Sequence, residues 1–286
     1  MTESTRAASR KARVYIFREF LLQTYGDYLS PGDVVLDVAG GKGDLSWLLK
    51  NVDDLESIVV DPRVVKNHIE KSVSYLREHP EEVLVRAIPD RLTYQPLATL
   101  IPKVQHKEDF QTPRHLRILV NNALVAAVQL FRRQKSVIRG SDFDQWQAYW
   151  TSAVERARQA QTLGYREDSA ATESEIISAQ EALNTILSAK LIVGFHPDQA
   201  TDSCIDLALE LGIPFCVVPC CVFPAEFPDR RLPDGSPVRY YSQFIDYLLS
   251  KSGSIRAACL NFQFTETSKN LALYTVPIKI LKKGMN

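Results

Sequence analysis

Val34-Val35-Leu36-Asp37-Val38-Ala39-Gly40-Gly41-Lys42-Gly43-Asp44 is the stretch that decides the fold. An apolar run ends in a carboxylate, turns through glycines and opens into the apolar segment 45–49, which predicts a strand, a tight loop and a helix. A backbone that passes close to a ligand has no room for Cβ atoms, and some positions of such a loop need a positive φ. The loop is therefore expected to hold a ligand against its backbone.

A second apolar run, 58–61, ends in Asp61 and follows the first after about twenty residues. Asp61 is placed to accept hydrogen bonds from the hydroxyls of a ribose. A glycine cluster alone is also typical of a flexible turn. Because the preceding strand, Asp37 and Asp61 accompany it in register, we favour a nucleotide-type cofactor site.

The spacing of the glycines separates two classes of cofactor. A dinucleotide site needs Gly-x-Gly-x-x-Gly, whereas this loop has Gly41, Gly43 and then Ser46 in place of the third glycine. Asp44, in the first turn of the expected helix, would repel a pyrophosphate but not a cation. These features favour a sulfonium cofactor over a diphosphate.

The pattern Asp37-x-Ala39-x-Gly41-x-Gly43 resembles the first motif of class I S-adenosylmethionine-dependent methyltransferases, Asp-x-Gly-x-Gly-x-Gly. The resemblance implies that S-adenosylmethionine is the cofactor, that the loop backbone contacts its methionine part and that Asp61 binds its ribose. The expected cofactor-binding residues are Asp37, Ala39, Gly40, Gly41, Gly43 and Asp61. Ala39 replaces the first glycine and is expected to keep an ordinary φ.

The rest of the chain alternates between apolar runs and helical patterns, except between about residues 90 and 190. The strands are expected at 33–38, 57–61, 83–88, 191–195 and 215–218, with a closing pair at 254–264 and 271–278; the helices are expected at 15–22, 44–51, 63–77, 143–158, 173–189 and 200–211. We predict an α/β fold with a Rossmann-like methyltransferase sheet, helices on both faces, an antiparallel C-terminal strand pair and a largely helical insertion. The expected organisation is a helical lead-in, 1–30, packed on the sheet, and a methyltransferase domain, 31–286.

The segment from about 90 to 190 is longer than a crossover needs and is interpreted in part as a lid or substrate-recognition surface. Pro102 and Pro113 indicate loops, 117–132 a helix or a strand followed by a helix, and 159–172 a polar linker. Trp146 and Trp150 share one side of a helix and are interpreted as core residues, with a stacking platform for a base as the alternative.

A second group of candidate residues follows the fourth and fifth expected strands: His196, Asp198, Cys220 and Cys221. Ligands bind beyond the carboxyl ends of strands in open α/β sheets, so both loops are expected to face the glycine loop. His196 is a candidate general base or a helix cap, and Asp198 a cap or substrate ligand. We expect the cysteines to line the wall where methyl donor and acceptor meet, and we expect no metal site, because Cys216 leaves its strand at another depth than Cys220.

These two loops resemble a narrower branch, which contains the tRNA acceptor-stem 2′-O-methyltransferases and the glutathione S-transferase C-terminal-domain-containing proteins. The shared features are a His motif, Ala-Thr-Asp before an apolar helix, and a strand that ends in Cys-Cys. The tRNA enzymes have Lys before the His and His-His after the Cys pair, where this chain has Phe195 and Val222-Phe223. The Asn/Asp-Pro-Pro-Tyr motif of amino-methylating enzymes is also missing.

Composition limits the remaining possibilities. The 286 residues carry no formal net charge, which argues against a strong overall attraction to nucleic acid. No run of eighteen apolar residues predicts a membrane span. Five cysteines without a disulfide framework favour an intracellular protein, cytoplasmic or nuclear. The basic segment 1–14 is interpreted as a disordered lead-in, with a mitochondrial presequence, and hence a mitochondrial protein, as the alternative.

The motif and the two resemblances thus predict an S-adenosylmethionine-dependent methyltransferase. Its expected substrate and partner is RNA, either tRNA or rRNA. The alternatives are an inactive scaffold with the same fold in an RNA-protein assembly, and a methyltransferase for small molecules or proteins. Arg230, Arg231 and Arg239 are candidate contacts to a phosphate backbone, but we favour solvated loop charges.

Overall fold

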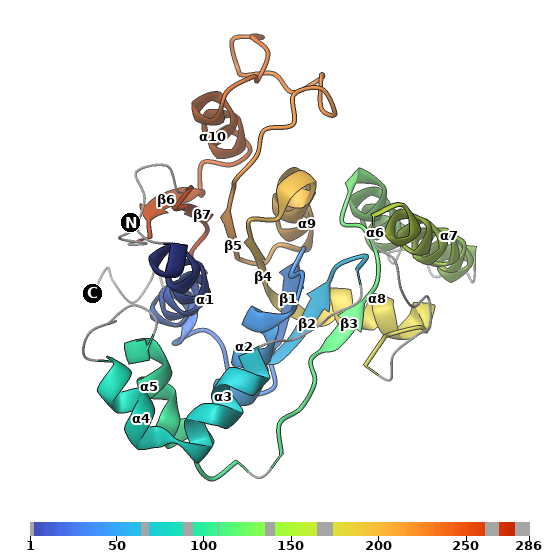
Figure 1. Ribbon diagram of the computed structural model, residues 1–286. Helices are drawn as coiled ribbons and strands as arrows, with labels where there is room; N and C mark the ends of the chain where they lie inside the picture. The colour runs from blue at the N-terminus through green and yellow to red at the C-terminus, as the bar shows by residue number, and fades with distance from the viewer. Residues whose placement is uncertain are drawn as a thin grey trace, which may run out of the picture.

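A computed structural model describes residues 3–63, 69–87, 94–107, 109–134, 141–164, 174–260 and 269–277. The strands in this part of the chain are β1 Val34–Val38, β2 Glu56–Val60, β3 Arg114–Leu116, β4 Ala189–Phe195, β5 Phe215–Val218, β6 Arg256–Cys259 and β7 Leu271–Tyr274. They form one sheet in the order β3-β2-β1-β4-β5-β7-β6 (Figure 1). The first five strands are parallel, and β7 is antiparallel to both β5 and β6.

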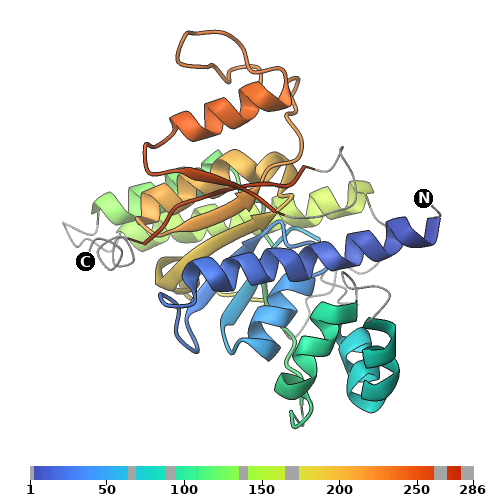
Figure 2. The same ribbon diagram turned by 90° about the vertical axis from the view of Figure 1, so that its left-hand side faces the viewer.

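Helices cover both faces of this sheet (Figure 2). Their bounds are α1 Glu3–Tyr25, α2 Asp44–Val52, α3 Ile69–Glu78, α4 Pro80–Ala87, α5 Tyr94–Val104, α6 Asn122–Gln134, α7 Ser141–Gly164, α8 Ala179–Ser188, α9 Thr201–Leu211 and α10 Tyr241–Ser250, with a 3-10 turn η1 at Asp198–Ala200. One core joins α1 and α2 to β1, β4, β5 and β7, and another joins α6–α10 to the opposite sheet face. The mixed α/β class predicted from the sequence is confirmed at this level.

The predicted strands around the glycine loop are confirmed. β1, β2, β4 and β5 lie within two residues of their expected bounds, because each is an apolar run whose residues are almost all buried. The antiparallel closing pair is also confirmed in β6 and β7. The first helix packs on the sheet as expected: the Tyr25 hydroxyl donates to the carbonyl of Phe215 at 2.7 Å and to that of Thr275 at 3.1 Å.

The third strand was predicted at 83–88, and this prediction is wrong. Residues 80–87 form α4, and the third strand in sequence, β3, comes at 114–116. Pro80 occupies the first helical position and Glu81 and Glu82 the first turn, which together are a strong helix-start signal. A short apolar run does not distinguish a strand from a helix, and here Val85 is 67% exposed. Residues 88–90, which are the last residue of the expected strand and its closing turn, lie outside the described residues.

The long segment before β4 is more regular than expected. The expected loop around Pro102 is wrong, because Pro102 lies inside α5. In the described part of the chain, helices α3–α5 lie between β2 and β3, and helices α6–α8 lie between β3 and β4. The long segment is thus divided between two connections, β2 to β3 and β3 to β4. The first connection contains α4, where a strand was expected.

Several helix bounds also differ from the predicted ones. α1 begins at Glu3, so the expected disordered lead-in is wrong for the described residues. α7 continues to Gly164, into the expected linker, while 165–173 lie outside the described residues. α8 begins at Ala179 instead of 173, because Ser178 accepts a hydrogen bond from the Glu181 amide and caps it. Of the predicted helix 63–77, residue 63 is non-helical, 64–68 are not described and α3 begins at Ile69.

Trp146 and Trp150 belong to the core, as predicted. They are 1% and 3% exposed, and their indole N–H groups donate to the carbonyls of Ala179 and Ile177 at 2.7 and 3.0 Å. Their ring centroids lie 6.3 Å apart. These buried rings hold α7 against α8.

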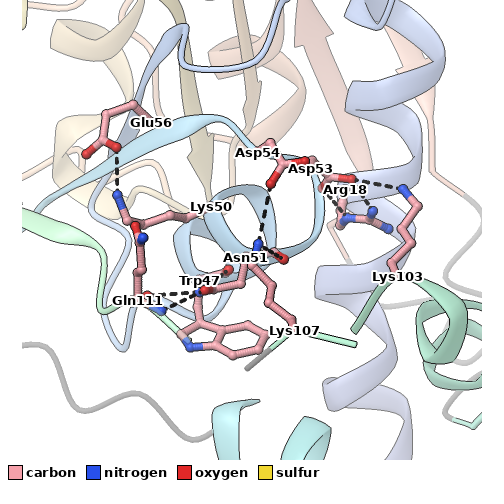
Figure 3. A network of polar contacts seen from close by, with 10 residues as sticks. All are labelled: Arg18, Trp47, Lys50, Asn51, Asp53, Asp54, Glu56, Lys103, Lys107 and Gln111. Carbon is pink, nitrogen blue, oxygen red and sulfur yellow. Dashed lines mark hydrogen bonds and ion pairs between the residues drawn. The ribbon is translucent and has the colours of Figure 1, made fainter. Parts of the chain in front are cut away.

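The C-terminal end of α2 is fixed by the polar network drawn in Figure 3. The side-chain amide of Asn51 donates to the carbonyl of Gln111 at 2.9 Å, and the Gln111 amide donates back to Asn51 Oδ1 at 2.8 Å. Lys107 Nζ donates to the Asn51 carbonyl at 2.7 Å, which satisfies part of the helix end. Arg18 pairs with Asp53 and ties the same end to α1. With one end anchored, α2 presents its other end, the glycine loop, in a fixed position.

Candidate functional site

The glycine loop between β1 and α2 has three residues in the left-handed region. Ala39, Gly41 and Gly43 have φ values of 53°, 57° and 75°. The expectation of an ordinary φ at Ala39 is therefore wrong. A non-glycine residue in this region costs roughly 1–2 kcal/mol, and the Ala39 amide donates to the Val60 carbonyl at 2.8 Å, which helps to hold it there. Ala39, at the position of the motif's first glycine, thus has the backbone conformation of a glycine.

Gly40 is required by close packing rather than by its φ. A Cβ at this position would lie 2.6 Å from Asp37 Oδ2 and 3.0 Å from the Asp37 carbonyl oxygen. Gly43 is the N-cap residue of α2 and makes no side-chain capping hydrogen bond. The positive end of the α2 dipole therefore lies at the glycine loop, and the Ser46 amide of its first turn donates to the buried Asp37 carboxyl.

Asp37 is a buried acid directly beneath this loop. It is 1% exposed, and its Oδ2 accepts a hydrogen bond of 2.9 Å from the Ser46 hydroxyl. Ser46 in turn accepts one of 3.0 Å from Ser57. The other carboxyl oxygen of Asp37, Oδ1, is buried without a hydrogen-bond partner among the described residues. Burial raises the pKa of Asp37 to about 7, so the carboxyl is partly protonated at neutral pH.

Asp61, the expected ribose ligand, directly follows β2 and touches the glycine loop. The Gly41 amide donates to Asp61 Oδ2 at 3.0 Å. The same carboxylate is held by Arg63, whose Nε lies 2.9 Å from Oδ1 and whose Nη2 lies 2.9 Å from Oδ2. The Arg63 side chain is half exposed, while that of Asp61 is buried. In this conformation the guanidinium contacts both oxygens of the Asp61 carboxylate.

His115 contacts the backbone of Asp61, and the sequence analysis did not identify it as a site residue. Its Nε2 lies 2.7 Å from the Asp61 carbonyl oxygen, and the residue is buried on β3. Burial lowers the pKa of His115, so the neutral ring donates this hydrogen bond through Nε2–H. No signal in the sequence located this residue, because β3 itself was not predicted. Arg63 was also missed, although its place two residues after Asp61 was visible.

His196 follows β4 in a left-handed conformation, with φ 56°. Burial lowers the pKa of its ring to about 4, so it is neutral at physiological pH. Its Nε2 is buried and has no hydrogen-bond partner among the described residues. A base with so low a pKa draws a proton only weakly, so the site favours hydrogen bonding and orientation over general-base catalysis for His196.

Asp198, Cys220 and Cys221 are brought together across the ends of β4 and β5. The Cys220 thiol donates to Asp198 Oδ1 at 3.0 Å, and the three donor atoms of the group all lie within 4.8 Å of one another. Asp198 has φ 47° and does not cap α9 with its side chain; its carbonyl accepts from the Thr201 hydroxyl at 2.8 Å. The interpretation of Asp198 as a side-chain cap is therefore wrong.

Cys216 takes no part in this group, because it lies on β5 in the buried core. Burial also raises the pKa of its thiol well above the ordinary range. The sequence argues against a metal site of Cys220 and Cys221 with Cys216 and His196, because Cys216 and Cys220 are expected to leave their strand at different depths. The positions of Cys216 and Cys220 agree with that argument.

Arg230 is not a phosphate contact. It is 6% exposed, pairs with Asp202 on α9 and stacks on Phe244 with its guanidinium 4.5 Å from the ring centroid. Neither interpretation of this residue, phosphate contact or solvated loop charge, is correct. Arg231 and Arg239 are exposed, so only these two of the three arginines remain candidates for a phosphate backbone.

Two cavities lie away from this edge of the sheet. One, of about 470 Å³, is lined by residues of α6 and α9, and one of about 350 Å³ lies beside Arg117 and α7. Neither is lined by a residue of the glycine loop or of the loops that carry His196 and Cys220. The candidate residues thus form two groups at the carboxyl ends of neighbouring strands: Asp37, Gly40, Gly41 and Asp61 beside β1 and β2, and His196, Asp198, Cys220 and Cys221 beside β4 and β5.

Comparison with known proteins finds no family model that matches the chain and no match among curated proteins. Among the described helices, none is both long enough and apolar enough to cross a membrane.

Proposed function

We propose that the chain is an S-adenosylmethionine-dependent methyltransferase that acts on RNA, built on a Rossmann-like methyltransferase sheet. The strand order around β1 and β4 supports this fold, because order reverses there, and a doubly wound sheet binds its ligand beyond the strand ends at such a switch point. The antiparallel pair β6 and β7 agrees with the closing pair that the resemblance to methyltransferases implies. Membership of the narrower tRNA-methylating branch is part of the same proposal.

One contact carries the proposal: the 3.0 Å hydrogen bond from the Gly41 amide to Asp61 Oδ2. It joins the glycine loop to the acid at the end of the next strand. Both belong to the edge of the sheet where the carboxyl ends of β1 and β2 meet. A ligand that lies on the loop backbone is therefore within reach of the Asp61 carboxylate.

The residues fit an adenosyl sulfonium ligand. The absence of a side chain at Gly40 and the left-handed turns at Gly41 and Gly43 keep the loop close to Asp37 and leave its backbone bare. The positive N-terminal end of the α2 dipole suits the ligand's carboxylate, while Asp44 suits its positive charge. Asp61 would hold the ribose after Arg63 moves aside. When bound, the cofactor supplies the methyl group.

The chain's contribution to transfer is positional. His196 is neutral and offers a buried, unpartnered Nε2 among the described residues, which suits a hydrogen bond to the acceptor molecule. Cys220 and Asp198 would form the facing wall. Holding donor and acceptor in line removes much of the entropic barrier of a bimolecular step. RNA as substrate rests on the resemblance of the His and Cys-Cys loops, with Arg231 and Arg239 as exposed cations.

The test is methyl transfer from S-[methyl-³H]-adenosylmethionine to separated pools of RNA, protein and small metabolites. We expect label in the RNA pool with the wild-type chain and loss of label with Asp61→Ala. Asp246→Ala, an exposed acid on α10, is the matched control and should retain activity. Label only in protein or metabolites would overturn the RNA substrate, and full activity of Asp61→Ala would overturn the assigned ribose ligand.

An inactive scaffold is the second candidate, and the Arg63 contact favours it. Both carboxylate oxygens of Asp61 are engaged within the protein, by Arg63 and by the Gly41 amide. A chain in which this ion pair is permanent would keep the fold without binding cofactor. Calorimetric titration with S-adenosylmethionine distinguishes the two, because the scaffold releases no binding heat.

A further inference from the structure

We propose that Asp198, Cys220 and Cys221 form a binding site for a thiophilic divalent cation, with Zn²⁺ as the best-matched ion. Their donor atoms, one carboxylate oxygen and two sulfurs, all lie within 4.8 Å of one another. Among the described residues, no other group of three or more His, Cys, Asp or Glu side chains lies close enough together to hold an ion. It does not depend on the methyltransferase proposal.

The dimensions of the group suit a tetrahedral ion. Bonds of ~2.3 Å to sulfur and ~2.0 Å to oxygen place a bound sulfur and oxygen about 3.5 Å apart, and two bound sulfurs about 3.8 Å apart. The observed separation of 3.0 Å from the Cys220 sulfur to Asp198 Oδ1 is shorter and corresponds to a hydrogen bond. An ion would replace the shared proton and move the two atoms apart by a few tenths of an ångström, roughly 0.5 Å.

The backbone places these donors on one point from two directions. Asp198 comes from the loop after β4, and both cysteines come from the loop after the neighbouring strand β5. Asp198 has φ 47°, a conformation that a residue with a side chain seldom adopts. This turn directs the carboxylate toward the thiol of Cys220 instead of toward the start of α9. Since Asp198 and Cys221 are exposed and Cys220 is half buried, an ion has a path from solvent.

The chemistry of the donors selects the ion. Two thiolates favour zinc over magnesium or calcium, which require oxygen ligands. Binding forms two Zn–S bonds and one Zn–O bond and releases the two thiol protons to water, so no oxidant is needed. Three protein ligands leave one position open, as in zinc sites that bind water or a substrate atom.

The site differs from the one that the cysteine spacing indicates, in which Cys216 and His196 join Cys220 and Cys221. Spacing along the chain pointed to Cys216, but that residue is buried in the core. The third donor comes instead from Asp198, more than twenty positions before Cys220 and on another loop. Cys259 is an exposed thiol that does not belong to the group, so it serves as a matched control.

The test uses the full chain, reduced and stripped of metal. It is titrated with Co²⁺, and binding is followed by visible absorption. It is then titrated with Zn²⁺ in the presence of a competing chelator, which gives the affinity for Zn²⁺. We expect one ion per chain, the intense visible bands of tetrahedral cobalt with sulfur ligands, and release of protons on binding. Loss of an outer partner of a metal ligand weakens binding about 10- to 100-fold, so Cys221→Ser and Asp198→Asn, which lose a direct ligand, should bind at least about tenfold more weakly.

Cys259→Ser should bind as the wild type does. Circular dichroism checks that each variant is folded, which is expected because Cys221 and Asp198 are exposed. The proposal is overturned if the wild type binds no stoichiometric ion, if the two ligand variants bind like the wild type, or if Cys259→Ser loses as much affinity as they do. Methyl transfer is measured separately, so failure of one proposal does not affect the other.

Discussion

Arg63 lies on the carboxylate of Asp61, with Nε 2.9 Å from Oδ1 and Nη2 2.9 Å from Oδ2. The same carboxylate accepts the amide of Gly41. Any ligand whose hydroxyls bind Asp61 must therefore compete with a side chain of the protein itself. The ion pair makes ligand binding sensitive to a residue outside the glycine motif.

Arg63→Ala is expected to strengthen binding of S-adenosylmethionine. The Arg63 side chain is half exposed, so the ion pair contributes only ~0.5–1 kcal/mol, which corresponds to a roughly two- to fivefold lower Kd. Calorimetric titration of both proteins provides the measurement. Weaker binding by the variant would mean that Arg63 contacts the ligand instead of competing with it.

Gly40→Ala is expected to destabilise the fold as well as the site. The new Cβ would lie 2.6 Å from Asp37 Oδ2, so a buried carboxyl has to move. We expect the free energy of unfolding to fall by about 1–3 kcal/mol. Gly253→Ala is the matched control, because its Cβ would have no neighbour within 4 Å. Urea unfolding curves that are the same for both variants would contradict the packing argument.

Asp37 should make stability depend on pH. Its pKa is raised from 3.8 to about 7 in the folded protein by burial. The folded state thus holds this proton more tightly than the unfolded chain, and the contribution of Asp37 to stability falls as pH rises from about 4 to about 7. The steepest slope is ~1.4 kcal/mol per pH unit. Urea unfolding of the wild type and Asp37→Asn across this range should diverge; parallel curves would show an ordinary pKa.

Arg230 should matter for stability rather than for RNA. Its guanidinium pairs with Asp202 and lies 4.5 Å from the ring centroid of Phe244, both in the interior. Arg230→Ala leaves Asp202 with Lys251 as its remaining partner, at 3.3 Å, and should lower the free energy of unfolding by roughly 2–5 kcal/mol. Arg231→Ala, at an exposed neighbour, should change it by less than about 0.5 kcal/mol. Equal thermal shifts for the two variants would contradict this assignment.

The sequence predicted the parts of the fold that have a strong local signal. β1 and β2 are apolar runs followed by a turn, and their order and loops follow from that pattern. β3 has only three residues, including Arg114 and His115, so no hydrophobic periodicity predicted it. Pro80 begins a helix that runs through the apolar residues expected to form a strand, because a helix-start signal fixes the backbone while a short apolar run fits both structures.

The candidate site was predictable as a location but not as a set of contacts. The carboxyl ends of parallel strands share one edge, so the loops after β4 and β5 were expected to meet there. The contact of Asp198 with Cys220 depends on the left-handed φ of Asp198, and that of Arg63 with Asp61 on the conformation of one long side chain. Tertiary packing sets both, and neither leaves a periodic signal in the sequence.

Titration calorimetry with S-adenosylmethionine tests the central claim most directly. Hydrogen bonds to a charged group contribute ~1.5–3 kcal/mol, so Asp61→Asn should bind about 10- to 100-fold more weakly than the wild type. The exposed-acid control Asp246→Asn should bind like the wild type. We predict one binding site per wild-type chain with this loss in Asp61→Asn; absence of binding heat in the wild type, or equal affinity in Asp61→Asn, would contradict a cofactor site built from the glycine loop and Asp61.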